Sequence, residues 1–363
     1  MPESGSLLPR PEVQATPSDQ HGALDYAELT RLGIAPDEII DFSVNSNPFG
    51  PSPAVREALQ RVVVERYPDC EALALRHALA EKFGHALPQL LIGNGTAELL
   101  WLLALAFVRP GDTALILKPT FGEYARGVTL LGGRIQSIQA KEEDEFGFAP
   151  VTIHQALREI NPRLTFICNP NNPTGTVLPA ETISELATAH PRTLFVIDEA
   201  YLQFVPGLRS CMTLNLPNLL VLRSLTKDYA IAGLRLGFAA GPLDLIGALA
   251  KVRPPWNVNA VAQEAGLAAL MDEDYLAQSL TRLRAAKADF LAGLRTLGLE
   301  PIPSATHYFI LKVGNAVEFR RKLLEYKIQV RDCTSFGLPD YIRVATRKPE
   351  ENAQLLSALK EML

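Results

Sequence analysis

The segment LVLRSLTKDYAIAGLRLGF places Lys227 close to three side chains that can bind an anion. Ser224, Thr226 and Arg235 lie within eight residues of the lysine, and two hydroxyls with a bidentate guanidinium suit one phosphate dianion. A lysine in a strand-to-loop turn is ordinarily a solvated surface residue. Beside a phosphate site, however, a lysine is what the Schiff base of pyridoxal 5′-phosphate (PLP) requires. The segment therefore predicts this cofactor.

An apolar stretch in LFVIDEAYLQF ends in polar residues that could bind the ring of such a cofactor. Asp198 follows four apolar residues, and a carboxylate buried there needs a partner. A protonated pyridine nitrogen would be that partner and would keep the ring an electron sink. Tyr201 could reach the phenolic oxygen of the ring, or it could be a core aromatic residue whose hydroxyl is satisfied within the protein.

Two loops could complete the site. In FICNPNNPTG, Asn172 lies either in an ordinary turn or in a ligand-binding loop at the carboxyl edge of a sheet, where it could bond a ring substituent. In LIGNGTAELLWLL, a glycine-bounded turn leads into an apolar helix. The backbone N–H groups of Gly95, Thr96 and Ala97 would point at an anion, unless Thr96 is simply the N-cap. There is no GxGxxG pattern, so a dinucleotide fold is not indicated.

The elements that must position these residues alternate along the chain. Short apolar, β-rich stretches recur at residues 113–119, 164–170, 193–199, 219–224 and 234–241. Several are apolar throughout, which is typical of parallel strands covered on both faces, and helical patterns such as AETISELATAH lie between them. The alternation predicts an α/β fold, with a large PLP-binding domain built on a doubly wound, mostly parallel sheet.

The last third of the chain has a different pattern. A long helical stretch covers residues 272–298, and strand-like HYFILKV, IQVRDC and YIRVAT follow, with a helix after the first and another at the end. This order predicts a smaller C-terminal α+β domain. We expect residues 1–45 to form an N-terminal arm and a segment of the small domain. The large domain is expected at 46–265 and the small domain at 266–363.

Composition argues against several other classes of protein. The 363 residues have a formal net charge of −5, so no nucleic-acid partner is expected. The four scattered cysteines form no CxxC or Cys/His cluster, so we expect neither a metal site nor a disulfide framework, and reduced thiols fit a cytoplasmic protein. The first twenty residues lack a signal-peptide pattern. The most apolar stretch, LLWLLALAFV, is too short to span a membrane, so no membrane association is expected.

Together these segments resemble the fold-type I PLP enzymes of the class I and II aminotransferase family. The motifs span nearly the whole chain in order: GNGTAEL, PTFGEY, NPNNPTG, DEAY, SLTK, AGLRLGF and a late Arg343. The resemblance implies that Lys227 is the Schiff-base lysine and that Asp198 lies at the pyridine nitrogen. It implies that Asn172 and Tyr201 bind the phenolic oxygen and that Phe121 stacks on the ring. The implied phosphate ligands are Gly95, Thr96, Ala97, Ser224, Thr226 and Arg235.

The resemblance also implies a homodimer whose sites are built from both chains. Tyr67, in ERYPD, resembles the tyrosine that these enzymes extend across the dimer to the neighbour's phosphate. Ala97 departs from the family pattern, since many relatives have Asp there. The backbone contact survives this change, but a side chain at the helix start is lost.

Two sister families of this fold handle small phosphorylated amines. HGALDYAELTRLGI, DFSVNSNPFGP and VRDCTSFGLPDYIRVATRKPEEN resemble threonine-phosphate decarboxylases, although the opening is His-Gly-Ala rather than His-Gly-Gly. Histidinol-phosphate aminotransferases usually have glutamate at the position of Ser46, whereas FGLPDYIR is common in them too. We therefore expect decarboxylation of L-threonine O-3-phosphate in cobalamin side-chain synthesis. The alternative is transfer of the amino group of histidinol phosphate to 2-oxoglutarate in histidine biosynthesis.

Either reaction needs groups that hold the anions of the substrate. Arg331 and Arg343 fall in adjacent short strands and could form one clamp, and His21 could assist. Each arginine could instead form a surface ion pair worth about 0–1 kcal/mol, and His21 could simply be solvated. A non-catalytic binding protein on the same fold is a more remote alternative. The intact set of Lys227, Asp198 and Arg235 argues against it.

Overall fold

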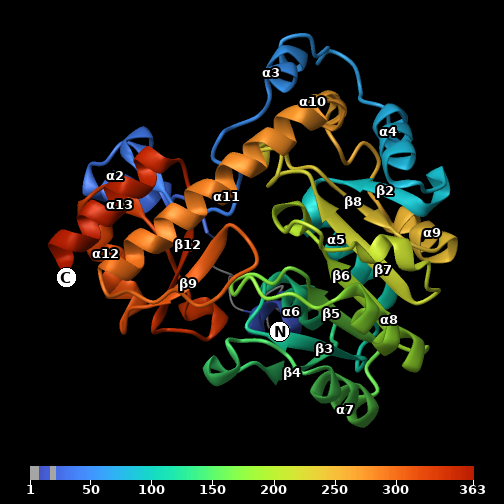
Figure 1. Cartoon of the computed structure of the whole chain (residues 1–363). Coiled ribbons are helices and arrows are strands. Elements are labelled where there is room, and N and C mark those ends of the chain that lie inside the picture. Colours follow the sequence, from blue (N-terminus) through green and yellow to red (C-terminus); the bar gives the residue numbers. More distant parts are fainter. Residues whose placement is uncertain (1–7, 17–21) are drawn as a thin grey trace, which may run out of the picture.

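The core of the molecule is a seven-stranded sheet (Figure 1). The computed structural model describes residues 8–16 and 22–363. The strand order is β2-β8-β7-β6-β5-β3-β4. Neighbours from β7 to β4 are parallel, whereas β8 is antiparallel to both β7 and β2. The strands are β2 (Leu90–Gly93), β3 (Thr113–Lys118), β4 (Arg134–Gln139), β5 (Leu164–Cys168), β6 (Leu194–Asp198), β7 (Leu219–Ser224) and β8 (Gly237–Ala240).

Helices cover both faces of this sheet, which explains why its central strands are apolar. Strands β5, β6 and β7 are buried along their whole length. Side chains of α5, α6 and α9 pack on one face, and those of α4, α7, α8 and α10 pack on the other. The predicted doubly wound, mostly parallel sheet is confirmed. These helices are α4 (Leu73–Phe83), α5 (Gly95–Phe107), α6 (Glu123–Leu130), α7 (Pro150–Ile160), α8 (Ala180–Ala189), α9 (Leu243–Val252) and α10 (Ala260–Met271).

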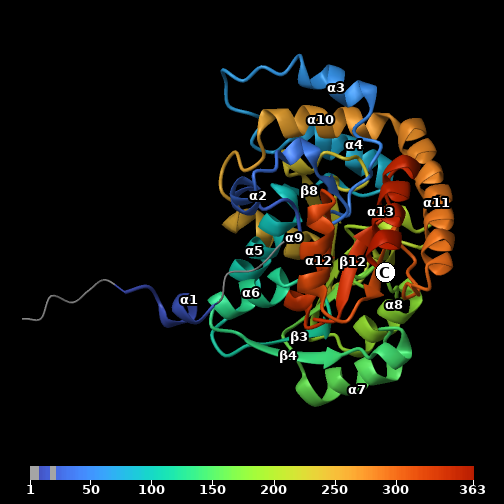
Figure 2. The same cartoon turned by 90° about the vertical axis from the view of Figure 1, so that its left-hand side faces the viewer.

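A smaller layer stands beside the large sheet (Figures 1 and 2). Its antiparallel sheet has the order β11-β12-β9, and β1 pairs in parallel with β10. The elements are α11 (Glu273–Thr296), β9 (Tyr308–Lys312), α12 (Ala316–Glu325), β10 (Ile328–Gln329), β11 (Arg331–Asp332), β12 (Tyr341–Ala345) and α13 (Pro349–Met362), with α1 (Pro11–Ala15), α2 (Tyr26–Leu32), β1 (Ile40–Asp41) and α3 (Pro53–Leu59) before the large sheet. The domain bounds 1–45, 46–265 and 266–363 remain our proposal. The pairing of β1 with β10 supports the assignment of the N-terminal segment to the small domain.

Some strands differ from the sequence-based expectation. The apolar pattern does not predict β2 or β4, because β2 is short and β4 is an edge strand whose side chains are mostly exposed. Strand β8 begins three residues later than expected, since Ala232–Leu234 form a 3-10 turn and Arg235 has a φ of 58°. The IQVRDC stretch divides between β10 and β11, which belong to different sheets.

Within the described ranges, no helix is both long and apolar enough to cross a membrane. The same residues contain no group of histidine, cysteine and carboxylate side chains that could hold a metal ion. All four cysteines are free thiols.

Gly175 marks a close approach between a loop of the large sheet and the smaller layer. The Ala305 N–H donates to the Gly175 carbonyl at 3.0 Å, and the Tyr308 hydroxyl donates to the Asn171 carbonyl at 2.9 Å. Gly175 has a φ of 73°, and a Cβ there would lie 1.9 Å from Oγ of Ser304. Backbone conformation and contact therefore both exclude a side chain at this position.

Gly175→Ala should lower the free energy of unfolding by more than about 2 kcal/mol. The left-handed conformation costs an L-residue roughly 1–2 kcal/mol, and overpacking adds about 1–3 kcal/mol. Gly207→Ala is the matched control, because Gly207 has a φ of 75° and open space around it. Urea unfolding of both variants measures the difference. A loss in Gly175→Ala no larger than that in the control would contradict the close approach.

Candidate active site

Lys227 lies just after β7, at the carboxyl edge of the large sheet. The charges of Asp198, Arg235 and Arg343 all act on its amine. Burial, together with the two guanidinium charges, lowers the pKa of Lys227 to about 8, and Asp198 offsets part of this shift. A lysine with such a pKa supplies a useful fraction of free amine near neutral pH, and the free amine is the form that attacks a carbonyl carbon.

Asp198 closes β6 and is held by two hydrogen bonds. The Tyr124 hydroxyl donates to Oδ2 at 2.8 Å, and the Ala200 N–H donates to Oδ1 at 3.0 Å. Burial raises the pKa of Asp198, while these two bonds and the charge of Lys227 offset part of the rise. A protonated ring nitrogen beside the carboxylate would stabilise its charged form. The position therefore fits the pyridine nitrogen of PLP.

The start of α5 and the turn at Arg235 form a cradle for an anion. A Cβ on Gly95 would lie 2.7 Å from Nη2 of Arg235, so the guanidinium lies directly against the helix N-terminus. Ser224 and Thr226 are buried, and their hydroxyls share a hydrogen bond of 2.7 Å. Backbone N–H groups at a helix start attract anions, and the arginine adds a full positive charge. The first turn of this helix consists of Gly95, Thr96 and Ala97.

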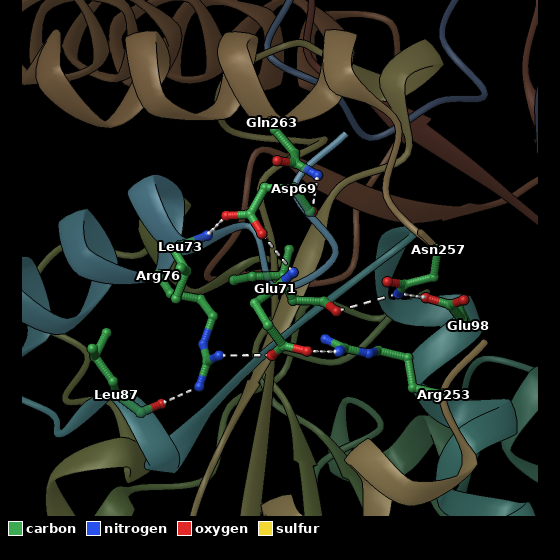
Figure 3. Close-up of polar contacts among 10 residues, drawn as sticks. Asp69, Glu71, Leu73, Arg76, Leu87, Glu98, Arg253, Asn257 and Gln263 are labelled. Carbon is green, nitrogen blue, oxygen red and sulfur yellow. Dashed lines mark hydrogen bonds and ion pairs between the residues drawn. The ribbon is translucent and has the colours of Figure 1, made fainter. Parts of the chain in front are cut away.

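Glu98 fixes the turn that precedes this helix, and Figure 3 shows its contact with Asn257. One oxygen of its carboxylate accepts from the Asn94 N–H and from Nδ2 of Asn257, each at 2.6 Å. Asn257 belongs to the loop after α9, so the loop and the helix start are held together. Glu98 thereby binds the Asn94 donor and leaves the next N–H groups of the helix for a phosphate.

The segment that carries Tyr67 is anchored beside the same loop. Glu71 accepts from Arg76 at 2.9 Å and also pairs with Arg253, as Figure 3 shows. Tyr67 itself is 77% exposed and stacks on Trp256 with ring centroids 4.5 Å apart. Tyr67 is therefore displayed on the surface, where a second chain could receive it.

Arg343 is buried where β12 meets the loop of Asn172. Its Nη1 donates to Oδ1 of Asn172, and its Nη2 donates to the Ser43 carbonyl. Its guanidinium lies 5.7 Å from the ring centroid of Tyr308. Arg331 is directly opposite Arg343 in the β11–β12 register. Opposed side chains of an antiparallel pair share one face, as a joint anion clamp would require.

The remaining predicted residues lie in three different settings. Tyr201 is buried edge-on against Tyr308, with centroids 4.9 Å apart, and burial raises its pKa to about 12. Phe121 follows β3 and lies edge-on to Tyr124 at 5.7 Å. His21 lies outside the described residues.

Sequence reasoning missed Tyr124, Tyr308 and Ser43, which position the predicted residues. Tyr124 lies in the PTFGEY motif, but it bonds a carboxylate 74 residues further along the chain. Tyr308 lies in a predicted strand, and Ser43 lies in the DFSVN motif. The sequence motifs that contain these residues could be identified, but their contacts could not, because the contacts depend on how the two sheets pack together.

Comparison with known proteins places this arrangement in a family. Residues 37–359 match the family described as aminotransferase class I and II. Histidinol-phosphate aminotransferase 1 of Thiobacillus denitrificans is 36% identical over 97% of this chain and 93% of its own length. Histidinol-phosphate aminotransferase of Sinorhizobium meliloti, solved in complex with pyridoxal-5′-phosphate, has a TM-score of 0.86 and 25% identity, covering 99% of this chain and 98% of that one. L-Threonine-O-3-phosphate decarboxylase of Porphyromonas gingivalis has a TM-score of 0.79 and 28% identity, covering 88% and 98%.

Tyr124→Phe should shift the loss of activity in acid to a higher pH. The Tyr124 hydrogen bond favours the charged form of Asp198 and lowers the pKa of that carboxyl. Without the bond the pKa rises, so Asp198 is neutralised at a higher pH and no longer supports a protonated ring nitrogen. The pH profile of kcat/KM measures the shift.

The matched control is Tyr275→Phe, which loses a hydroxyl bonded to the Phe49 and Gly50 carbonyls. Its profile should follow that of the wild type. An unshifted acid limb in Tyr124→Phe would refute the role of this hydroxyl.

Proposed function

Because the chain belongs to the family of class I and II aminotransferases, and its cofactor is pyridoxal 5′-phosphate, we propose that it transfers the amino group of histidinol phosphate to 2-oxoglutarate. The supporting observation is the agreement among curated relatives. Eight of them are 33–36% identical over at least 92% of this chain, and all are histidinol-phosphate aminotransferases. This proposal reverses the order expected from the sequence motifs, which favoured decarboxylation.

PLP supplies the electron sink for the bond that breaks at the reacting carbon of the substrate. We assign Lys227 to hold the cofactor, and its Nζ would also move the proton at that carbon. Its pKa of about 8 suits a base working near neutral pH. Asp198 would hold the proton of the ring nitrogen. Asn172 and Tyr201 would bind the phenolic oxygen, and Phe121 would cover the ring.

We propose separate ligands for the phosphate of the cofactor and for the anionic groups of the substrate. The cradle at the start of α5 would hold the cofactor phosphate, where its donors come from both backbone and side chains. Arg331 and Arg343 would hold the anions of the substrate. The phosphate ligands are Gly95, Thr96, Ala97, Ser224, Thr226 and Arg235.

Decarboxylation of L-threonine O-3-phosphate is the second candidate, and two observations favour it. Ser46 stands where the aminotransferases usually have glutamate, and the decarboxylase of Porphyromonas gingivalis is 28% identical to this chain. That substrate carries a carboxylate and a phosphate, so it too would use two cationic holders. The decarboxylase would release carbon dioxide without any keto acid.

The two candidates differ in products that are easy to measure. We expect the enzyme to form glutamate from 2-oxoglutarate when histidinol phosphate is supplied, and Lys227→Ala should abolish this turnover. Borohydride should trap a pyridoxyl group on Lys227 in the wild type, as mass spectrometry of the peptides would show. Carbon dioxide release from threonine phosphate, without glutamate formation from histidinol phosphate, would replace the first candidate by the second.

We also propose a homodimer in which Tyr67 serves the site of its partner. The homodimer of either single variant, Lys227→Ala or Tyr67→Ala, should have impaired activity. Co-expression should restore activity, because about half of randomly paired dimers are mixed and each mixed dimer holds one intact site, roughly one site in four overall. Activity of the purified mixture should therefore exceed that of either parent. Absence of any recovery would show that Tyr67 does not act across the dimer.

A further inference from the structure

We infer that Arg284, Lys287 and His307 form a second anion site, which binds a phosphate group outside the proposed cofactor and substrate sites. The three side chains line a pocket of about 150 Å³ that also borders on the 3-10 turn Leu202–Phe204 after β6. In the described part of the chain, none of the residues that line it is one that we assign to the cofactor or the substrate. The pocket is several times larger than a water molecule, so it admits a polyatomic anion.

Lys287 lies on α11 without a counter-ion. Its Nζ donates to the Ser304 carbonyl at 2.6 Å, and an ammonium group has two further donors. No aspartate or glutamate is among the described residues that line the pocket. Burial lowers the pKa of Lys287 to about 8, a shift that a nearby carboxylate would oppose. An anion in the pocket would therefore meet a lysine whose charge is not compensated.

Arg284 adds a second positive charge to the same side of α11. It precedes Lys287 by three residues, a spacing that places two side chains beside one another on a helix. Its Nη2 donates to Oγ1 of Thr281 at 2.8 Å, and a guanidinium has further N–H donors. Like charges at this spacing repel each other. An anion bound between the two cations would turn this repulsion into attraction.

His307 supplies a donor that has no acceptor in the described part of the protein. Its side chain is only 4% exposed, and neither ring nitrogen has a hydrogen-bond partner among the described residues. Burial and the charges of Lys287, Arg343 and Lys227 hold the pKa of His307 well below its usual range, so the ring is neutral near pH 7 and keeps one N–H to donate. Buried polar groups ordinarily have a partner, and an anion in the pocket would be that partner.

Apolar side chains form the rest of the wall. The ring centroids of Phe204 and His307 are 3.9 Å apart, and Leu280 and Leu283 of α11 line the same pocket. An apolar wall strengthens the attraction between an anion and nearby cations, because it lowers the local dielectric constant. It also offers a surface to a small organic group esterified to the phosphate. The pocket therefore suits a phosphate group, either as the free ion or as a monoester.

Trace acetylation of the holoenzyme tests the site at a single lysine. At pH 8 about half of Lys287 is uncharged, because its pKa is about 8, and the uncharged amine is the form that reacts with acetic anhydride. A bound phosphate should raise this pKa by roughly one unit or more. Saturating inorganic phosphate should therefore slow the acetylation of Lys287 by about fivefold or more, as mass spectrometry of the peptides would show.

Lys322, which is exposed on α12, is the internal control. Its acetylation should be the same in phosphate and in sodium chloride of equal ionic strength, whereas phosphate alone should protect Lys287. Half-maximal protection is expected at roughly 0.1–10 mM phosphate, the affinity that two charge-assisted hydrogen bonds supply. A parallel titration with ethyl phosphate distinguishes the occupants. Tighter protection would assign the site to a phosphate monoester, and equal or weaker protection would assign it to the free ion.

Substitutions around the pocket locate the bound anion. Arg284→Gln removes one charge, and His307→Phe keeps an aromatic ring against Phe204 while it removes both ring nitrogens. Each should raise the half-maximal phosphate concentration by about tenfold, the effect of one lost hydrogen bond. Arg282→Gln is the matched control, because it removes the same charge from the same helix, but its Cζ lies over the ring of Phe49 at 4.0 Å. The control should behave as the wild type does.

Two results with the wild-type enzyme would overturn the inference, whether or not the variants fold. One is the absence of protection of Lys287 up to about 10 mM phosphate. The other is equal slowing of Lys287 and Lys322, which would show that phosphate acts only through ionic strength. Unchanged protection in both Arg284→Gln and His307→Phe would also overturn it.

Discussion

Burial of opposite charges at one edge of the large sheet is the constraint on which the rest of the site depends. Removing a charged group from water costs free energy, and here the same burial lowers the pKa of Lys227 and raises that of Asp198. Arg235 and Arg343 push the pKa of the lysine further down. The protein thus maintains a reactive amine near a carboxylate that favours a cationic partner. A cofactor with an aldehyde and a basic ring nitrogen meets both needs.

The parallel sheet brings these groups together because its strands end at a common edge. Asp198 is in register with Cys168 of β5 and with Leu222 of β7, so the loops that follow all three strands begin side by side. The central strands are buried on both faces, so close packing keeps their backbone in place. The hydroxyl of Tyr124 and the N–H of Ala200 can therefore hold the carboxylate in one orientation, which loops alone would not do.

The sequence was sufficient to predict the doubly wound, mostly parallel sheet, because its buried strands are apolar along their whole length. Short polar motifs also led to the family and its cofactor, because they are contiguous in the sequence. It was not sufficient for β4, whose polar residues lie at an exposed edge, or for the division of IQVRDC between two sheets. Tyr124 and Ser43 were missed for another reason. Each acts through a partner that is brought close only by tertiary packing, and the residue types alone do not identify that partner.

The difference between the two candidate reactions is hard to read for the same physical reason. Both use the same electron sink, and the bond that breaks is the one held perpendicular to the plane of the ring. That orientation depends on where the substrate's anions are fixed, which we propose to be at Arg343 and Arg331. Arg343 is not positioned by its own strand alone. Its position is fixed jointly by the loop of Asn172, by Ser43 and by Tyr308, which come from three distant parts of the chain. If Arg343 holds the substrate as we propose, reaction specificity depends on how these three segments pack together, and Asn172 links that packing to the cofactor site.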